Sequence, residues 1–243
     1  IEGVIHAQRD KASLFEDAVF ARSLAQLGKS TTFAAIVHPA RCLEVARPFL
    51  ESGVHMLMEK PIAPTYEDGQ KLVELAERSG VIFQVGHLER YNAGFMELVK
   101  RVGQPRFIEA TRIGGFSERA TDVDVVTDLM IHDIDIVMSL VNSPIRDISA
   151  IGVPVLTEHA DIANARIEFE NGAVANVTAS RVSNKKQRRI RVFGRHSYHA
   201  LDFGDSQVEV AHAVPNPSGL NAHETAASLA AAYAEPARAA GVI

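Results

Sequence analysis

The sequence has 243 residues, of which 47% are hydrophobic and 23% charged, and its net charge is −5. These are ordinary values for a globular protein of one large or two modest domains. The acidic balance gives no indication of a general nucleic-acid-binding surface, and the single cysteine, Cys42, excludes an internal disulfide and fits a reducing compartment. No apolar run reaches the length of a membrane span, and residues 1–15 lack a signal-peptide pattern. We therefore expect a cytoplasmic protein with no membrane and no nucleic-acid partner.

Residues 33–85 alternate between short apolar runs and amphipathic segments, after an expected helix over about residues 14–27. This alternation is typical of parallel βαβ units with right-handed crossovers. Short continuous apolar runs predict strands that are buried on both faces. The expected strands are 33–37, 54–58 and 81–85. Pro39 is expected to begin the first helix, and Pro48 to disturb its last turn. The second helix is expected to begin after the cap residue Thr65 and to end before Gly80.

The pattern changes after Gly86, and the second half is dominated by strands. A short helix begins at Asn92 or Gly94 and ends at Val102, and a strand over 105–113 alternates between its two faces before Gly114-Gly115. Asn171-Gly172 predicts a hairpin between two of the later strands. Consecutive strands joined by turns predict an antiparallel sheet, with strands at 145–153, 161–170, 173–181, 187–194 and 197–203.

These patterns predict an α/β half followed by an α+β half with an antiparallel sheet, and the boundary lies near residue 86. Residues 213–243 read as a linker and an Ala-rich tail, which is either a weak helix or a poorly ordered end.

One predicted helix, from Val125 to Val141, carries an acid and an imidazole four residues apart. Val126, Leu129, Met130, Val137 and Leu140 recur at helical spacing and define its apolar side. Asp128 and His132 lie on one face, one turn apart, so the carboxylate can fix the tautomer of the ring and raise its basicity. The alternative is an ordinary helix start, where acids are favoured by the helix dipole.

Polar residues follow each predicted parallel strand, at the edge of the sheet where ligands bind in open α/β proteins. His38-Pro39 follows the first strand and Glu59-Lys60-Pro61 the second. Lys60 is a candidate acid, base or hydroxyl-binding group, and its bond to Pro61 is a candidate cis bond. The alternative is a strand-end lysine paired with Glu59.

The segment after the third strand is rich in hydrogen-bonding side chains, namely His87, Arg90, Tyr91 and Asn92. This composition suits a polyhydroxylated substrate, and it equally suits a polar hinge between domains. The basic run from Lys185 to Arg189 is either a solvated strand edge or a group of phosphate contacts.

Taken in order, these motifs resemble the Gfo/Idh/MocA family of NAD(P)-dependent sugar oxidoreductases. The matching segments are Glu59-Lys60-Pro61, Gly86-His87 with Arg90-Tyr91-Asn92, Gly114-Gly115 and Asp128–Asp135, and the strands of 166–194 resemble the second domain of this family. The resemblance covers about residues 33–210, and within the family it is greatest to members of the UDP-N-acetylglucosamine 3-dehydrogenase type.

The resemblance implies an α/β fold with a Rossmann-like parallel nucleotide-binding domain, here incomplete, over 1–86. It implies an α+β domain with a large open antiparallel sheet, for substrate binding and dimerisation, over 87–212. The implied reaction is hydride transfer between a sugar carbon and NAD or NADP. The resemblance also implies that Lys60, Asp128 and His132 are catalytic, with His132 as general base and Lys60 on the substrate hydroxyl and the cofactor ribose. The implied substrate is a sugar or nucleotide sugar, and the implied partner is a second copy that pairs through the sheet. Residues implied at the cofactor are His38, Pro39, Glu59, Lys60 and Pro61, and those implied at the substrate are His87, Arg90, Tyr91 and Asn92.

The sequence departs from this family at its beginning, because it contains no G-x-G-x-x-G turn for a pyrophosphate. Either the first βαβ unit is absent or degenerate, or part of it lies outside this sequence. The alternative function is therefore that of a sugar-binding or assembly protein that derives from the family and has lost dinucleotide binding. A metal site built from Asp128, His132, Asp133 and Asp135 is a third hypothesis, although the last two acids lie away from the shared face.

Overall fold

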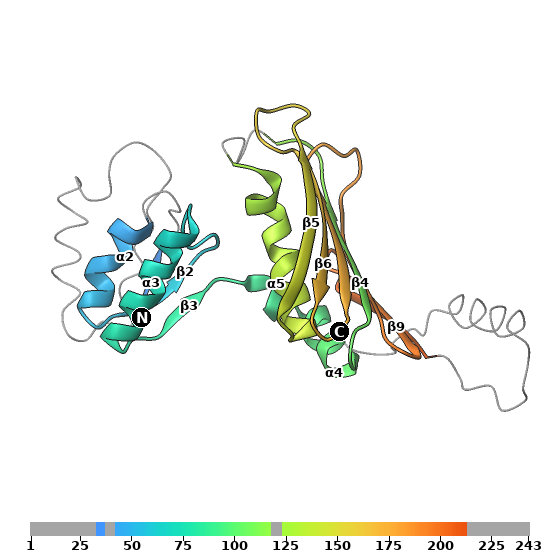
Figure 1. Ribbon diagram of the computed structural model, residues 1–243, viewed down its shortest axis with the longest axis horizontal. Coiled ribbons are helices and arrows are strands. Elements are labelled where there is room, and N and C mark those ends of the chain that lie inside the picture. The colour runs from blue at the N-terminus through green and yellow to red at the C-terminus, as the bar shows by residue number, and fades with distance from the viewer. Residues whose placement is uncertain (1–32, 37–41, 118–122, 213–243) are drawn as a thin grey trace, which may run out of the picture. The chain divides into compact units, whose positions relative to one another are not determined.

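The computed structural model describes residues 33–36, 42–117 and 123–212, the first of these ranges by its backbone alone. The chain divides into two compact units between Gly86 and His87 (Figure 1). The expected helix over 14–27, Pro39 and the Ala-rich tail lie outside the described residues.

The first unit is a parallel sheet with helices between its strands, as the sequence predicts. Its strands pair in the order β1-β2-β3, and both pairings are parallel. Buried side chains of both helices and of β2 form one core, in which Leu50, Met56 and Leu72 are almost fully excluded from solvent. The elements are β1 (Phe33–Ile36), α2 (Cys42–Glu51), β2 (His55–Met58), α3 (Tyr66–Ser79) and β3 (Phe83–Val85).

Local signals in the sequence define the ends of α3. Thr65 caps its start, because its side-chain oxygen accepts a hydrogen bond from the N–H of Asp68 at 3.2 Å. Gly80 ends it with a φ of 63°, a left-handed conformation that favours glycine. Pro48 lies inside α2, and this helix nevertheless continues to Glu51.

The second unit is built on a seven-stranded sheet with the order β10-β9-β8-β4-β7-β6-β5. The predicted strand at 145–153 is confirmed to the residue, whereas β10 was not predicted as a separate strand. Asn171-Gly172 forms the predicted hairpin between β6 and β7, with Gly172 at a φ of 84°. The strands are β4 (Phe107–Ile113), β5 (Ile145–Val153), β6 (Ile162–Phe169), β7 (Val174–Ser180), β8 (Gln187–Phe193), β9 (Ser197–Asp202) and β10 (Gln207–His212).

Every pairing in this sheet is antiparallel except that of β4 with β7, which is parallel. The exception arises because β4 inserts between two strands that follow it in the chain. The sheet is therefore open and mainly antiparallel, and the fold is the predicted α/β type: a Rossmann-like unit followed by an α+β unit.

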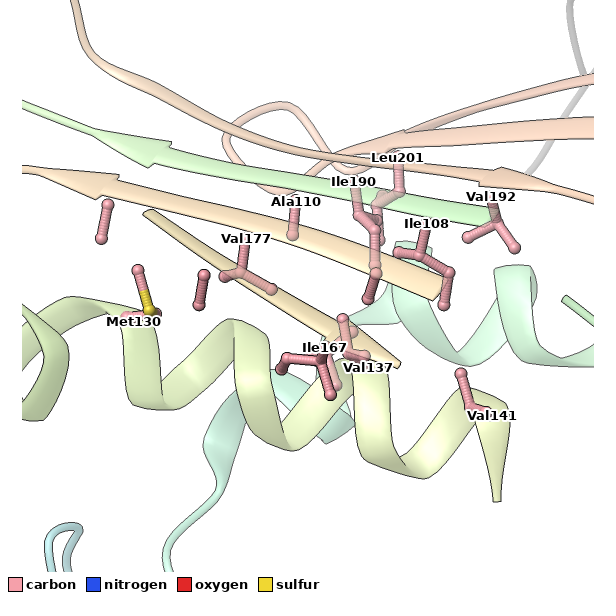
Figure 2. Packing of buried hydrophobic residues seen from close by; sticks show 14 of the residues in the cluster. Ile108, Ala110, Met130, Val137, Val141, Ile167, Val177, Ile190, Val192 and Leu201 are labelled. Carbon is pink, nitrogen blue, oxygen red and sulfur yellow. The ribbon is translucent and has the colours of Figure 1, made fainter. Parts of the chain in front are cut away.

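Helices cover one face of the large sheet, and the core lies between them. Alternate residues of β4, beginning with Ile108 and Ala110, are buried on this face, and Val137 and Val141 of the facing helix point toward the strands (Figure 2). The covering elements are η2 (Leu88–Tyr91), α4 (Ala93–Arg101), the π-helical turn η3 (Val126–Met130) and α5 (Ile131–Val141). No helix within the described ranges is both long enough and apolar enough to cross a membrane.

Candidate functional site

In the first unit, the carboxyl ends of β2 and β3 lie side by side and carry polar groups. The N–H of Gly86 donates to the carbonyl of Met58 at 2.7 Å, which joins the two strand ends. A Cβ on Gly86 would lie 3.2 Å from both oxygens of Glu59, so this carboxyl group packs where glycine leaves room. Lys60 follows, half-buried, and its bond to Pro61 is cis, as the sequence indicated.

Two of the predicted cofactor residues, His38 and Pro39, lie outside the described part of the chain. The described cofactor candidates are therefore Glu59, Lys60 and Pro61, all at one strand end. A carboxylate and an ammonium together can accept and donate hydrogen bonds, which is the combination that a ribose diol requires.

In the second unit, two of the predicted substrate residues are bound to an acid of α5. Arg90 donates through Nε to Asp135 Oδ2 at 2.7 Å and through Nη2 to Oδ1. His87 lies with Nε2 3.5 Å from the same Oδ1 atom. Arg90 keeps an exposed edge, because its side chain is 47% accessible. These contacts fix η2 against α5 and leave part of the guanidinium for a ligand.

The other two predicted substrate residues have contrasting surroundings. Asn92 caps α4, because its side-chain oxygen accepts from the N–H groups of Gly94 at 2.9 Å and Phe95 at 3.3 Å. Tyr91 is 68% exposed. Asn92 thus has a local structural task that accounts for its position in the sequence.

The helix that carries Asp128 and His132 is not a regular α-helix, which corrects the sequence-based expectation. Residues Val126–Met130 form a π-helical turn, in which the N–H of Ile131 reaches the carbonyl of Val126. The wider turn changes which residues face the core. Val125 is fully buried, whereas Val126, which was expected on the apolar side, is 37% exposed. π-helical turns inside α-helices occur frequently at functional sites.

Asp128 lies within this turn and His132 one residue after the start of α5. Both side chains are half-buried, so they are partly shielded from solvent and still accessible. The structure thus places the predicted pair at the irregular point of the helix. Lys60 belongs to the other unit, and it keeps its predicted role as a proposal.

An ion-pair network that the sequence did not reveal holds the turn after His132. Arg112, on β4, donates from Nε and Nη2 to Asp133 at 2.8 and 3.0 Å, and from Nη1 to Glu89 at 2.8 Å. Burial would lower the pKa of Arg112, but the bonds and charges of Asp133 and Glu89 raise it above its ordinary value. The network joins β4, η2 and α5 beside the candidate base.

A second network fixes the start of the same helix. Asp161 is fully buried, and its carboxylate accepts hydrogen bonds from the N–H groups of Val155, Leu156 and Thr157 and from Arg181 Nε at 2.7 Å. Arg181 also donates to the carbonyl of Val123 at 2.7 Å. Burial would raise the pKa of Asp161, but the backbone donors and Arg181 hold it well below its ordinary value.

Sequence reasoning missed Arg112, Asp161 and Arg181, and only weak signals could have found them. Arg112 lies on the same face of β4 as the apolar residues Ile108 and Ala110, so its burial could have been inferred from the alternation along the strand. Its partner is 21 residues away in sequence, and no local pattern identifies it.

The hypothesis of a metal site has little support in the part of the chain that the structure describes. Asp133 is bound to Arg112 and Asp135 to Arg90, so two of the four proposed ligands have cationic partners. Among the described residues, no group of three or more His, Cys, Asp or Glu side chains could hold a metal ion.

Comparison with known proteins identifies the relatives of both units. Residues 7–87 match the model described as "Oxidoreductase family, NAD-binding Rossmann fold", and residues 99–198 match the "GFO/IDH/MocA C-terminal domain". The predicted cofactor class, NAD or NADP, is thus that of the family whose first domain this chain contains.

Individual relatives are dehydrogenases of sugars and cyclitols. UDP-N-acetylglucosamine 3-dehydrogenase of Acidithiobacillus ferrooxidans is 36% identical over 169 residues, which are 69% of this chain and 54% of the relative. The scyllo-inositol 2-dehydrogenase (NAD(+)) of Bacillus subtilis is 29% identical over 55% of this chain and 43% of the relative. The chain thus spans about half the length of these relatives.

A solved structure of the Acidithiobacillus ferrooxidans enzyme is also similar. It has a TM-score of 0.74 and 34% sequence identity, with 79% of this chain and 63% of that chain covered. The order of the motifs, the two matched domains and the arrangement of the elements agree. The chain therefore belongs to the Gfo/Idh/MocA family of oxidoreductases.

Proposed function

We propose that this protein is an NAD(P)-dependent dehydrogenase that oxidises a hydroxyl-bearing carbon of a sugar or nucleotide sugar. The observation that carries the proposal is the Asp128 and His132 pair, half-buried where η3 meets α5. Oxidation of an alcohol releases a proton as the hydride leaves, so the reaction requires a base that is neutral near physiological pH. His132 accepts that proton, and Asp128 orients the ring and stabilises its protonated form.

Lys60 supplies positive charge in this proposal. Its ammonium group donates a hydrogen bond to the reacting hydroxyl and stabilises the negative charge that develops on oxygen as the proton leaves. Lys60 follows β2, at the edge of a parallel sheet where ligands of such folds bind.

The residues at this strand end fit a dinucleotide cofactor in their chemistry. Glu59 accepts hydrogen bonds from ribose hydroxyls, and Lys60 donates one. A bound nicotinamide supplies the acceptor for the hydride. His38 and Pro39, which follow β1 in the sequence and lie outside the described residues, complete the proposed set.

The substrate that we propose is UDP-N-acetylglucosamine, oxidised at the carbon that bears its 3-hydroxyl. Support comes from the relative that is 36% identical and has this activity in its name. The hydrogen-bonding groups of His87, Arg90 and Tyr91 suit a ligand with many hydroxyls.

A sugar-binding or assembly protein that does not bind a dinucleotide is the second candidate. The match of residues 7–87 to an NAD-binding family model favours the dehydrogenase over this candidate. Calorimetry with NAD and NADP separates the two candidates, because the second one predicts no binding of either.

The decisive experiment mixes the protein with NAD or NADP and UDP-N-acetylglucosamine and follows the absorbance of the reduced nicotinamide. We expect turnover in the wild type and a loss of about 10²- to 10⁴-fold in kcat for His132→Asn. Asp128→Asn should lower kcat and shift the pH profile, because the ring loses its anionic partner.

An exposed histidine provides the matched control. His196 lies in the turn between β8 and β9, and His196→Asn should leave kcat and KM unchanged. Absence of turnover with either cofactor, together with absence of cofactor binding, would refute the dehydrogenase proposal for this chain.

We also propose that the protein forms a homo-oligomer through the large sheet. The face opposite α4 and α5 carries a groove with mixed polar and apolar side chains, which include Ile151, Asn164, Thr178 and Arg191. The support is the resemblance to a family that uses its sheet in this way and the accessibility of the groove.

A further inference from the structure

Two neighbouring arginines of the basic run from Lys185 to Arg189, Arg188 and Arg189, lie on opposite faces of the large sheet. In β8, Ile190 and Val192 are buried in the core under the helices. Arg188, two residues before Ile190, therefore faces the helices, because side chains alternate along a strand. Arg189 faces the opposite way, and its Nη2 binds Glu209 at 2.9 Å.

Arg188 is a half-buried cation on the helix-covered face. It lies directly opposite Arg112 in the antiparallel pairing of β4 and β8. Arg112 binds both neighbouring carboxylates, Asp133 and Glu89. The charge of Arg188 acts on Asp133 from a greater distance, and no carboxylate of the described residues forms an ion pair with Arg188. A half-buried guanidinium keeps its charge and is stabilised by an anion, so this position suits an anionic ligand.

Gly114 directly follows β4, whose Arg112 pairs with Arg188, and it leaves space at this corner of the sheet. The N–H of Gly114 donates to the carbonyl of Ser180, and the N–H of Ser183 donates to the carbonyl of Gly114, each at 2.9 Å. A Cβ on Gly114 would meet no atom within 4 Å. Lys185 and Lys186 are exposed in the loop that follows, so they add positive charge at the same corner.

A short series of contacts connects Arg188 to the residue that follows the candidate base, His132. Arg188 neighbours Arg112 across one strand pairing, Arg112 binds Asp133, and Asp133 directly follows His132. Arg188 is therefore separated from the residue next to His132 by one strand pairing and one ion pair.

We propose that Arg188 binds the diphosphate of a nucleotide-sugar substrate through its guanidinium group, while the sugar lies at His132. This assignment rests on the proposed function and narrows its substrate class to sugars that carry a phosphate. Arginine matches phosphate oxygens with two parallel N–H donors, so the contact supplies orientation as well as affinity. Arg189 has no part in it, although it is the next residue.

Calorimetric titration with UDP, without any dinucleotide, tests this assignment independently of turnover. Wild type is expected to bind UDP, and Arg188→Met is expected to weaken the binding about 10- to 100-fold. Arg188→Lys keeps the charge and loses the two-donor geometry, so we expect about tenfold weaker binding. Arg189→Met is the matched control, on the same strand and the opposite face, and it should bind UDP as the wild type does.

Steady-state kinetics give a second readout. With UDP-N-acetylglucosamine, Arg188→Met should raise KM by a similar factor, whereas the kcat/KM for free N-acetylglucosamine should be unchanged. Circular dichroism shows whether Arg188→Met is folded, and the Lys variant carries the test if it is not.

Two results would overturn the assignment: wild type that does not bind UDP, or Arg188 variants that are folded and bind UDP with wild-type affinity. Failure of the proposed function looks different. If UDP binds in a manner that depends on Arg188 and no sugar is oxidised, the phosphate site stands and the dehydrogenase activity does not. If free and UDP-linked sugars are oxidised equally well by wild type and Arg188→Met, only the phosphate site is refuted.

Discussion

Three aspartates around one helix, Asp128, Asp133 and Asp135, have different partners and therefore different chemistry. Asp133 and Asp135 bind Arg112 and Arg90, so their charges are compensated within the fold. Asp128 lies in the π-helical turn before His132. Spacing in the sequence separated Asp128 from the other two, but the arginine partners are distant in the chain and could not be predicted.

Arg112 is the residue whose loss should be most costly to stability. Its side chain is 4% accessible and it compensates two carboxylates, so Arg112→Met removes the cation that is hydrogen-bonded to the buried Asp133 and leaves only the more distant charge of Arg188. We expect a decrease of about 3–5 kcal/mol in the free energy of unfolding, measured by urea denaturation. Arg101→Met removes an exposed ion pair with Glu97 and should cost less than about 1 kcal/mol. Equal effects of the two variants would contradict this account of the network.

Asp161 should make the stability of the protein depend on pH. Its pKa is lowered in the folded state, so its stabilising contribution is present above the unfolded value of about 4. The contribution is lost as pH falls from that value through the lower folded pKa. Melting temperatures of wild type and Asp161→Asn should therefore differ most at neutral pH and converge in acid. Two pH profiles that run parallel below about pH 4 would show that the carboxylate charge has no part in this stabilisation.

At the scale of elements, the sequence predicted features that depend on local signals and missed those that depend on tertiary contacts. Thr65 and Gly80 mark the ends of α3, and alternation marks the two faces of β4. The π-helical turn gives no such signal, because its apolar residues are compatible with a regular α-helix. The parallel pairing of β4 with β7 was also inaccessible, since β4 pairs with strands far away in sequence.

Substitution of two neighbouring valines tests which side of the π-helical turn before α5 faces the core. Val125 is fully buried and Val126 is 37% exposed. We expect Val125→Ala to reduce the free energy of unfolding by about 1.5–3 kcal/mol, and Val126→Ala to change it by less than about 0.5 kcal/mol. A regular α-helix with the apolar side expected from the sequence would bury Val126 instead. A larger effect at Val126 in urea denaturation would thus argue against the π-helical turn.

At the scale of the whole molecule, the two units differ in how far the sequence explains them. Five strands of the large sheet, β5 to β9, were predicted close to their observed bounds, whereas β10, the place of β4 in the sheet and the π-helical turn were not. For the first unit, the sequence predicted three parallel strands, and β1 to β3 have that arrangement.

Association of the molecule through the open face of its sheet is the last prediction. Thr178 lies in the groove of this face together with Arg166 and Arg191, and its side-chain oxygen accepts a hydrogen bond from Asn164 at 2.8 Å. If two copies meet here, Thr178→Arg adds bulk and a like charge on both sides of the interface, so the average mass in sedimentation equilibrium should shift toward that of a monomer. Met96→Arg, on the exposed surface of α4, introduces the same side chain elsewhere and should leave the mass unchanged. A wild type that is monomeric at micromolar concentration, or a Thr178→Arg variant with the wild-type mass distribution, would contradict an interface on this face.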